Sequence, residues 1–201
     1  MKASVYTRPN KPTRLTVRRR EDPAPMEART LAPPIAVDRA TECHVTPPDV
    51  ASYMVDCLEG VGDYQTLEPS AGTGALLRAL KDAGQSSLET IAIERHHELA
   101  RVLERQKFGT VIHECFLDYA ARAAGRVDYV HIIMNPPFRQ VRQHMNAALS
   151  LLGRNGHAEP ARLVALVPVT YDHPEAELMD TLGPDTFASA KVHTKIIRIS
   201  R

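Results

Sequence analysis

The tetrapeptide Asn135-Pro136-Pro137-Phe138 places an amide, two prolines and an aromatic ring directly after an apolar segment at 130–134. A proline fixes its own φ angle and restricts the residue before it to extended conformations, so Asn135 is expected outside a helix. The Asn135 side-chain carbonyl and the Pro136 carbonyl can both accept hydrogen bonds from one NH2 group, while Phe138 offers a ring face for stacking. The pattern favours a site for a planar amine, although an isolated Asn-Pro-Pro is also typical of a plain turn.

A second candidate site is the turn Glu68-Pro69-Ser70-Ala71-Gly72-Thr73-Gly74, which is expected to join a strand to a helix. Because glycine has no Cβ, Gly72 and Gly74 can let a ligand approach the backbone. Leu77 stands where a dinucleotide site needs a small residue, which argues against a hydride-transfer cofactor, and no Gly-Lys-Ser/Thr follows, which excludes a P-loop. Glu94 follows Gly74 by about 20 residues, the spacing at which a carboxylate binds ribose hydroxyls, so the ligand is expected to carry a ribose.

These residues need a sheet that brings the ends of several strands together. From about residue 36 onward, helix-like and strand-like segments alternate, which predicts an α/β fold with a mostly parallel sheet. Residues 115–119 are expected to form a loop. The expected strands are 64–67, 90–93, 110–113, 130–134, 163–169 and the alternating tail 191–199. The expected helices are one with Thr46 near its cap that ends near Gly60, two that follow Gly74 and Glu94, one over about 140–152 and one that begins near Pro174.

Length and composition limit the class of protein. The 201 residues suffice for one domain of ordinary globular composition, with 43% hydrophobic and 24% charged residues. No apolar run approaches the roughly 20 residues that span a bilayer, and no secretory signal is recognisable, so we expect a soluble cytoplasmic protein without a membrane partner. The three cysteines and nine histidines show no metal-ligand spacing, so no metal is expected.

The first 35 residues differ from the rest of the chain. Residues 1–34 hold eight lysines and arginines against three acids, together with six prolines. A segment with so few large apolar residues does not build a core, so residues 1–35 are expected to form a flexible basic arm and 36–201 the folded domain. Such an arm can attract nucleic-acid phosphates or serve only as a solubilising tail.

Over roughly residues 40–170, Thr46-Pro47-Pro48, the glycine turn, Glu94 and the tetrapeptide together resemble the S-adenosylmethionine-dependent N6-adenine DNA methyltransferases. The resemblance implies a Rossmann-like class I methyltransferase fold with helices on both faces of the sheet, S-adenosyl-L-methionine as cofactor and DNA as partner. It implies that the first two segments hold the methionine part of the cofactor and that Glu94 holds its ribose. The residues so assigned are Thr46, Pro47, Glu68, Ser70, Gly72, Gly74, Glu94, Cys115 and Phe116 for the cofactor, and Asn135, Pro136 and Phe138 for catalysis.

Two features depart from that family. Its members usually have an aspartate, which binds the adenine amine of the cofactor, where this chain has Cys115; Glu114 or Asp118 can substitute for it, and Phe116 can stack on the adenine. Only 18 residues follow Gly183, which leaves a truncated C-terminal hairpin as one outcome and no room for an added recognition domain. Sequence selectivity is then expected to be low, or to come from loops, from the basic arm or from a partner chain.

Other substrates and roles stay open. The tetrapeptide also occurs in enzymes that methylate rRNA guanine amines and protein glutamine amides, whereas the Thr46-Pro47 segment favours DNA over RNA or protein. A third interpretation is a non-catalytic module that binds the cofactor or nucleic acid for a partner chain, motivated by Cys115 and the short C-terminus. Arg139 and Arg142 follow the tetrapeptide and can either contact flanking phosphates or simply be solvated.

Overall fold

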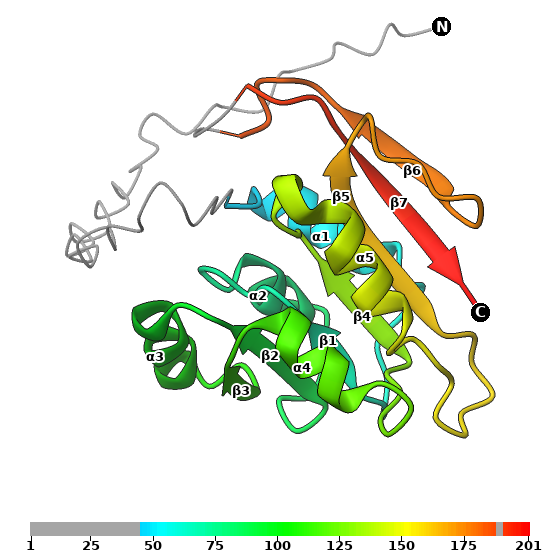
Figure 1. Cartoon of the computed structure of the whole chain (residues 1–201). Helices are drawn as coiled ribbons and strands as arrows, with labels where there is room; N and C mark the ends of the chain where they lie inside the picture. Colours follow the sequence, from blue (N-terminus) through cyan, green and yellow to red (C-terminus); the bar gives the residue numbers. More distant parts are fainter. Residues whose placement is uncertain (1–44, 188–190) are drawn as a thin grey trace, which may run out of the picture. The chain divides into compact units, whose positions relative to one another are not determined.

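The computed structural model describes residues 45–187 and 191–201, and these residues contain a seven-stranded sheet (Figure 1). The strands are β1 Thr66–Glu68, β2 Thr90–Glu94, β3 Thr110–His113, β4 His131–Met134, β5 Arg162–Pro168, β6 Glu177–Leu182 and β7 Thr194–Ser200. Their order is β3-β2-β1-β4-β5-β7-β6. Neighbouring strands from β3 to β5 pair in parallel, and β7 pairs antiparallel with both β5 and β6. The expected α/β class with a mostly parallel sheet is confirmed, while the expected arm at 1–35 lies outside the described residues.

Helices cover both faces of the sheet. They are α1 Pro48–Asp56, α2 Ala75–Asp82, α3 His97–Gln106, α4 Phe116–Ala123 and α5 Val141–Leu149, with a short 3-10 helix, η2, at Phe138–Gln140. Successive residues of a strand point to opposite faces, so Ile132 packs with α4 and α5 whereas Ile133 packs with α1 and α2. The expected arrangement of helices on both faces is therefore confirmed. No helix in the described ranges has the length and apolar character needed to cross a membrane.

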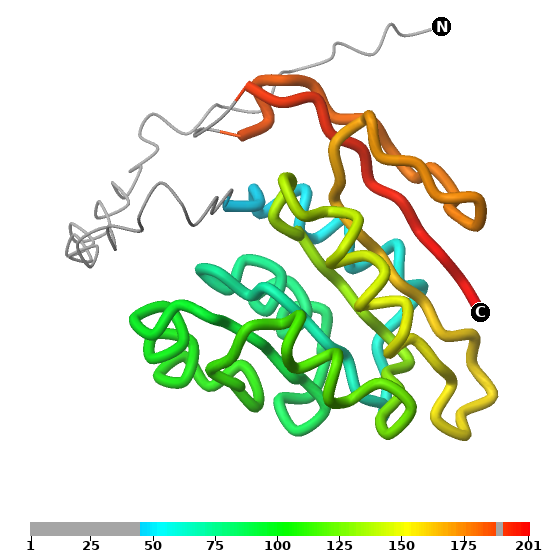
Figure 2. The backbone as a smooth tube through the Cα atoms, in the orientation of Figure 1, coloured from blue at the N-terminus to red at the C-terminus, as the bar shows by residue number. Residues whose placement is uncertain are grey.

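The order of the strands reverses between β1 and β4. Thr66 of β1 is level with Thr90 of β2 on one side and with His131 of β4 on the other. In Figure 2 the chain passes from β1 outward through β2 and β3 and then returns to lie beside β1 as β4. The connections after β1 and β4 therefore leave in opposite directions, which opens a crevice beyond the carboxyl ends of these strands. Both chemically suggestive segments begin there, the glycine turn after β1 and the tetrapeptide after β4.

The C-terminal hairpin is present and is not truncated. Strand β7 pairs with β5 along its whole length, from Arg162 opposite Ser200 to Pro168 opposite Thr194, and β6 pairs with its other edge. The expectation of a helix that begins near Pro174 is wrong, because the chain turns after β5 and enters β6 at Glu177. Its residues include good helix formers, but backbone pairing with β7 overrides that local preference. The strand expected in the tail at 191–199 is confirmed as β7.

Two local expectations about helices also change. Residues 115–119, expected as a loop, contain the first turn of α4, because Phe116 and Ala120 lie one turn apart and both pack into the core. Helix α1 has Pro47 at its N-cap position and Pro48 inside its first turn, with no side-chain cap. The hydroxyl of Thr46 is therefore not used to cap α1.

An ion network fixes the end of α1 to the C-terminal strands. The guanidinium of Arg198 in β7 donates to Glu59 over 2.6 Å and to Glu177 of β6 over 2.7 Å, and it also donates to the carbonyl of Cys57. Arg162 of β5 donates to the other oxygen of Glu59 over 2.5 Å. Because α1 begins two positions after Thr46, this network helps to hold one wall of the crevice in place.

Candidate active site

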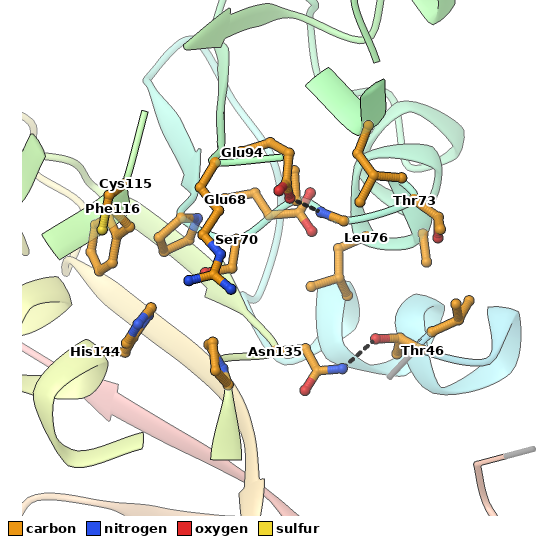
Figure 3. Close-up of a pocket in the computed structure, with 18 of the residues that line it drawn as sticks. Thr46, Glu68, Ser70, Thr73, Leu76, Glu94, Cys115, Phe116, Asn135 and His144 are labelled. Carbon is orange, nitrogen blue, oxygen red and sulfur yellow. Dashed lines mark hydrogen bonds between the residues drawn. The ribbon is translucent and has the colours of Figure 1, made fainter. Parts of the chain in front are cut away.

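A cavity of about 820 Å³, measured together with its open mouth, lies where β1, β2 and β4 end (Figure 3). Many of the residues singled out in the sequence line it, namely Thr46, Glu68, Ser70, Gly72, Glu94, Cys115, Phe116 and Asn135. The structure does not bring Pro47, Gly74, Pro136 or Phe138 into its lining. It thus gathers residues from five separate segments, whose individual roles stay predictions.

Glu94 holds the glycine turn. The backbone N–H of Gly72 donates to one carboxylate oxygen of Glu94 over 2.7 Å, and the N–H of His96 donates to the other oxygen, also over 2.7 Å. Gly72 has a φ of 53°, in the left-handed region that favours glycine. Since each carboxylate oxygen has two lone pairs, Glu94 can brace this turn and still accept hydrogen bonds from ribose hydroxyls.

Gly74 serves packing. It is the N-cap residue of α2 with a φ of 77°, and a Cβ built on it would lie 2.7 Å from Leu103 Cδ2 of α3. Gly74 is also absent from the cavity lining. The expectation that both glycines open the backbone to a ligand therefore agrees with the position of Gly72 only, while Gly74 allows α2 and α3 to approach each other.

Glu68 is a buried carboxylate that faces the cavity. The residue is 2% exposed, and its Oε2 has no hydrogen-bond partner among the described residues. Burial raises the pKa of Glu68 well above its ordinary value, and the negative charge of Glu94 raises it further, against smaller opposing effects of Arg78 and the Leu77 backbone. A carboxylate in this setting is either protonated or stabilised by a cationic group that enters the cavity.

Asn135 is tied to the segment that precedes α1. Its amide nitrogen donates to Thr46 Oγ1 over 3.1 Å, and Thr46 itself is only 5% exposed (Figure 3). This bond fixes the rotation of the Asn135 amide plane. Pro137 also lines the cavity, whereas Phe138 is half-buried and begins η2 outside the lining.

The acids proposed to replace a missing aspartate are not in the cavity. Glu114 forms an ion pair with Arg122 over 2.6 Å, and Asp118 is exposed in the first turn of α4. Neither of them lines the cavity, whereas Cys115 and Phe116 do.

Two further titratable residues, Arg95 and His144, line the cavity, and no motif of the sequence pointed to them. His144 lies on α5, is 6% exposed, and packs its ring 5.6 Å from the ring of Phe116. Burial, and then the positive charge of Arg95, lower the pKa of His144 to about 4, so the ring is neutral at physiological pH. The sequence gives little indication that His144 belongs to a site, because a lone histidine on a helix is usually a packing or surface residue.

No model of a known protein family matches the sequence, and no curated protein matches it. Solved structures with a similar fold do exist. One is the 23S rRNA methyltransferase ErmE, with a TM-score of 0.61 and 16% identity over 79% of this chain and 70% of that chain. Another is a modification subunit of a putative type I restriction enzyme from Vibrio vulnificus YJ016, with a TM-score of 0.62 and 16% identity over 79% of this chain and 44% of that chain.

A third similar structure is the methyltransferase subunit of a type I restriction-modification system from Streptococcus thermophilus. Its TM-score is 0.64, with 12% identity over 78% of this chain and 44% of that chain. The protein thus spans less than half the length of the two restriction-modification subunits. At these identities the likeness concerns the fold, and the chain has the Rossmann-like α/β fold of these methyltransferases.

Proposed function

We propose that this protein is a methyltransferase that moves the methyl group of S-adenosyl-L-methionine to the exocyclic N6 amine of adenine in DNA. The observation that carries the proposal is a shared cavity: Asn135, which follows β4, and Gly72, which follows β1, line the same space at the point where the strand order reverses. An amine held by Asn135 and a nucleoside cofactor held by the glycine turn would therefore meet.

The lining fits the proposed cofactor. Glu68 Oε2, which lacks a partner among the described residues, suits the ammonium group of the methionine part. Glu94, held in place by two backbone N–H groups, suits the ribose hydroxyls. When bound, S-adenosyl-L-methionine supplies an electrophilic methyl group on its sulfonium.

The chain's own contribution to the transfer is orientation. The side-chain carbonyl of Asn135, which lines the cavity, is proposed to accept a hydrogen bond from the target NH2 group. The carbonyl of Pro136, the next residue but outside the lining, is proposed to accept a second one, so that the nitrogen lone pair turns into the cavity. An exocyclic amine of adenine is a poor nucleophile because its lone pair is delocalised into the ring, so preorganised acceptors lower the barrier. The hydrogen bond to Thr46 keeps the Asn135 amide in this orientation. The transfer is direct and in line, without a covalent enzyme intermediate.

The DNA substrate would approach along the tetrapeptide and the start of α5. A target adenine in a duplex has to rotate out of the stack, which costs a few kcal/mol, and the half-buried ring of Phe138 is the proposed stacking partner. Arg139 and Arg142, both exposed, follow it and are proposed to contact flanking phosphates. Single-stranded DNA would avoid the cost of unstacking.

We also propose a partner chain for target recognition. Two of the similar structures are by name subunits of restriction-modification systems, and both are more than twice as long as the part that matches this chain. The basic arm at 1–35 would then add phosphate attraction that does not depend on DNA sequence.

The likeness to ErmE supports an alternative substrate, an rRNA amine, and protein glutamine is a second alternative. The deciding experiment incubates the purified chain with methyl-labelled S-adenosyl-L-methionine and single-stranded DNA, duplex DNA, rRNA or protein, and then identifies the methylated product after digestion. N6-methyladenine is expected. N2-methylguanine or N5-methylglutamine would support the alternatives, and cofactor binding without turnover would support a non-catalytic partner subunit.

The matched pair of variants for this assay is Asn135→Ala and Asn146→Ala. Asn146 is exposed on α5 and does not line the cavity, so its replacement is expected to leave transfer unchanged. Loss of transfer in Asn135→Ala with cofactor binding retained supports the catalytic role, whereas transfer at the rate of the unaltered protein would refute it.

A further inference from the structure

We infer that His144 recognises the adenine of the cofactor, in place of an acid. The inference rests on the proposed function and adds a specificity-determining residue to it. His144 lines the same cavity as Glu94 but belongs to a different element, since it lies on α5 after β4 whereas Glu94 ends β2. A nucleoside whose ribose meets Glu94 would turn the base edge farthest from the sugar toward His144.

The surroundings of His144 suit a flat heterocycle. Its ring lies 5.6 Å from the ring of Phe116 at an angle of 44°, and Phe116 is 3% exposed. Figure 3 draws Cys115, Phe116 and His144 at one end of the cavity and Thr46, Thr73 and Leu76 at the other. One end therefore offers an aromatic face together with a neutral hydrogen-bonding edge, which are the two features that bind a purine.

The other polar candidates at this end are engaged elsewhere. Glu114 is paired with Arg122, and Asp118 is exposed, so neither reaches the cavity. The thiol of Cys115 is at best a weak hydrogen-bond donor or acceptor. Arg95 and Gln140 also line the cavity, but His144 is the hydrogen-bonding side chain of the described lining whose ring contacts Phe116.

The burial of the ring indicates how it binds. Nδ1 of His144 is inaccessible to solvent and has no hydrogen-bond partner among the described residues. A buried nitrogen without a partner is better tolerated as a lone pair than as an N–H group, so the proton is assigned to Nε2. Nε2–H then donates to an unprotonated ring nitrogen on the Watson–Crick edge of the adenine, the N1 position.

The test compares two stable cofactor analogues, S-adenosylhomocysteine and S-inosylhomocysteine, by calorimetric titration. The inosyl compound carries an N–H group at N1, which faces Nε2–H as donor against donor. The unaltered protein is expected to bind the adenosyl compound at least about tenfold more tightly. His144→Leu should bind the adenosyl compound about tenfold more weakly and should lose this preference, while His144→Gln, which keeps an amide N–H, should regain part of it.

Control measurements distinguish a loss of adenine recognition from a loss of stability and from a failure of the proposed function. His157→Leu removes a histidine whose ring contacts Tyr64 outside the cavity, and it should keep the preference. Thermal unfolding of His144→Leu should show no loss of stability, because the change removes a buried nitrogen without a partner. If the unaltered protein binds the adenosyl compound and His144→Leu keeps the full preference, the inference about His144 is wrong. If the unaltered protein binds neither compound, the proposed function itself is wrong.

Discussion

Asn135 and Thr46 are 89 positions apart in the sequence, yet the amide nitrogen of Asn135 donates to the Thr46 hydroxyl over 3.1 Å. The bond joins the residue after β4 to the residue two positions before α1, so the orientation of one amide depends on two separate elements. The ion network of Glu59, Arg162 and Arg198 holds the far end of α1 in turn. The position of the proposed catalytic amide is therefore set by packing across much of the domain.

Replacing Thr46 with valine should slow methyl transfer. The change keeps the shape of the side chain but removes the acceptor that fixes Asn135, so we expect kcat to fall about tenfold, equivalent to ~1.4 kcal/mol in the barrier. Single-turnover kinetics with labelled cofactor would measure it. Thr66→Val in β1 is the matched control, because its buried hydroxyl has no partner among the described residues. An equal loss of rate in both variants would show that the Thr46–Asn135 bond is not responsible.

Replacing Glu68 with glutamine should stabilise the fold at high pH but weaken the binding of S-adenosyl-L-methionine. The raised pKa means that the folded protein binds a proton at Glu68 more readily than the unfolded chain does, so stability falls as pH rises above the ordinary carboxyl value. At pH 8 the variant is expected to unfold at a higher temperature than the unaltered protein. It should nevertheless bind S-adenosyl-L-methionine at least about tenfold more weakly, because a charge pair is lost. Unchanged affinity by calorimetry would remove Glu68 from the cofactor site.

Two neutral histidines should make the fold sensitive to acid. His131 is fully buried with no partner for either ring nitrogen in the described part of the chain, and burial lowers the pKa of both His131 and His144 to about 4. Between about pH 6.5 and 4 the unfolded chain binds more protons, so stability is full above 6.5 and falls as pH falls toward 4. Each histidine contributes up to about 3 kcal/mol to this loss.

The matched variant for the acid effect is His131→Phe. The phenyl ring can keep the edge contact with Tyr64, whose centroid lies 4.7 Å from that of His131, but it cannot take up a proton. Urea unfolding at pH 7 and pH 5 should show a smaller difference for the variant than for the unaltered protein. A difference of the same size would assign the acid sensitivity to other groups.

Removing residues 1–35 should change DNA binding in one specific way. The segment holds eight basic residues, and each contact that it makes with a phosphate adds about 0.9 to the slope of log affinity against log salt concentration. The shortened chain should show a flatter slope and an unchanged affinity for S-adenosyl-L-methionine. The same slope for both chains would mean that the arm does not contact DNA phosphates.

The parts of the site that the sequence predicts are those set by neighbours along the chain. Gly72 follows a short buried strand, Glu94 ends the next one, and Asn135 is followed by two prolines, so each position can be inferred from a few adjacent residues. Parallel pairing then brings the three strand ends to one edge, which follows from the alternation of strands and helices.

The parts that could not be predicted depend on contacts between distant segments. The region after Pro174 was expected to be helical, but pairing of Glu177–Leu182 with β7 determines its structure. Likewise, nothing next to His144 in the sequence indicates that α5 brings it against Phe116 of α4, 28 positions earlier. Sequence patterns indicate the local conformational preference of a segment, whereas the β6 strand and the contact of His144 with Phe116 depend on tertiary packing.

The carboxylate of Glu94 accepts hydrogen bonds from the backbone N–H groups of both Gly72 and His96, and this has a thermodynamic consequence. Because this turn already has a fixed shape before any ligand arrives, association does not have to freeze its backbone, and little ordering entropy is lost there. Calorimetry of nucleoside binding should accordingly show no large unfavourable entropy from this loop. The rate of association should increase in proportion to ligand concentration, as expected when diffusional encounter and not a slow rearrangement of the protein limits binding.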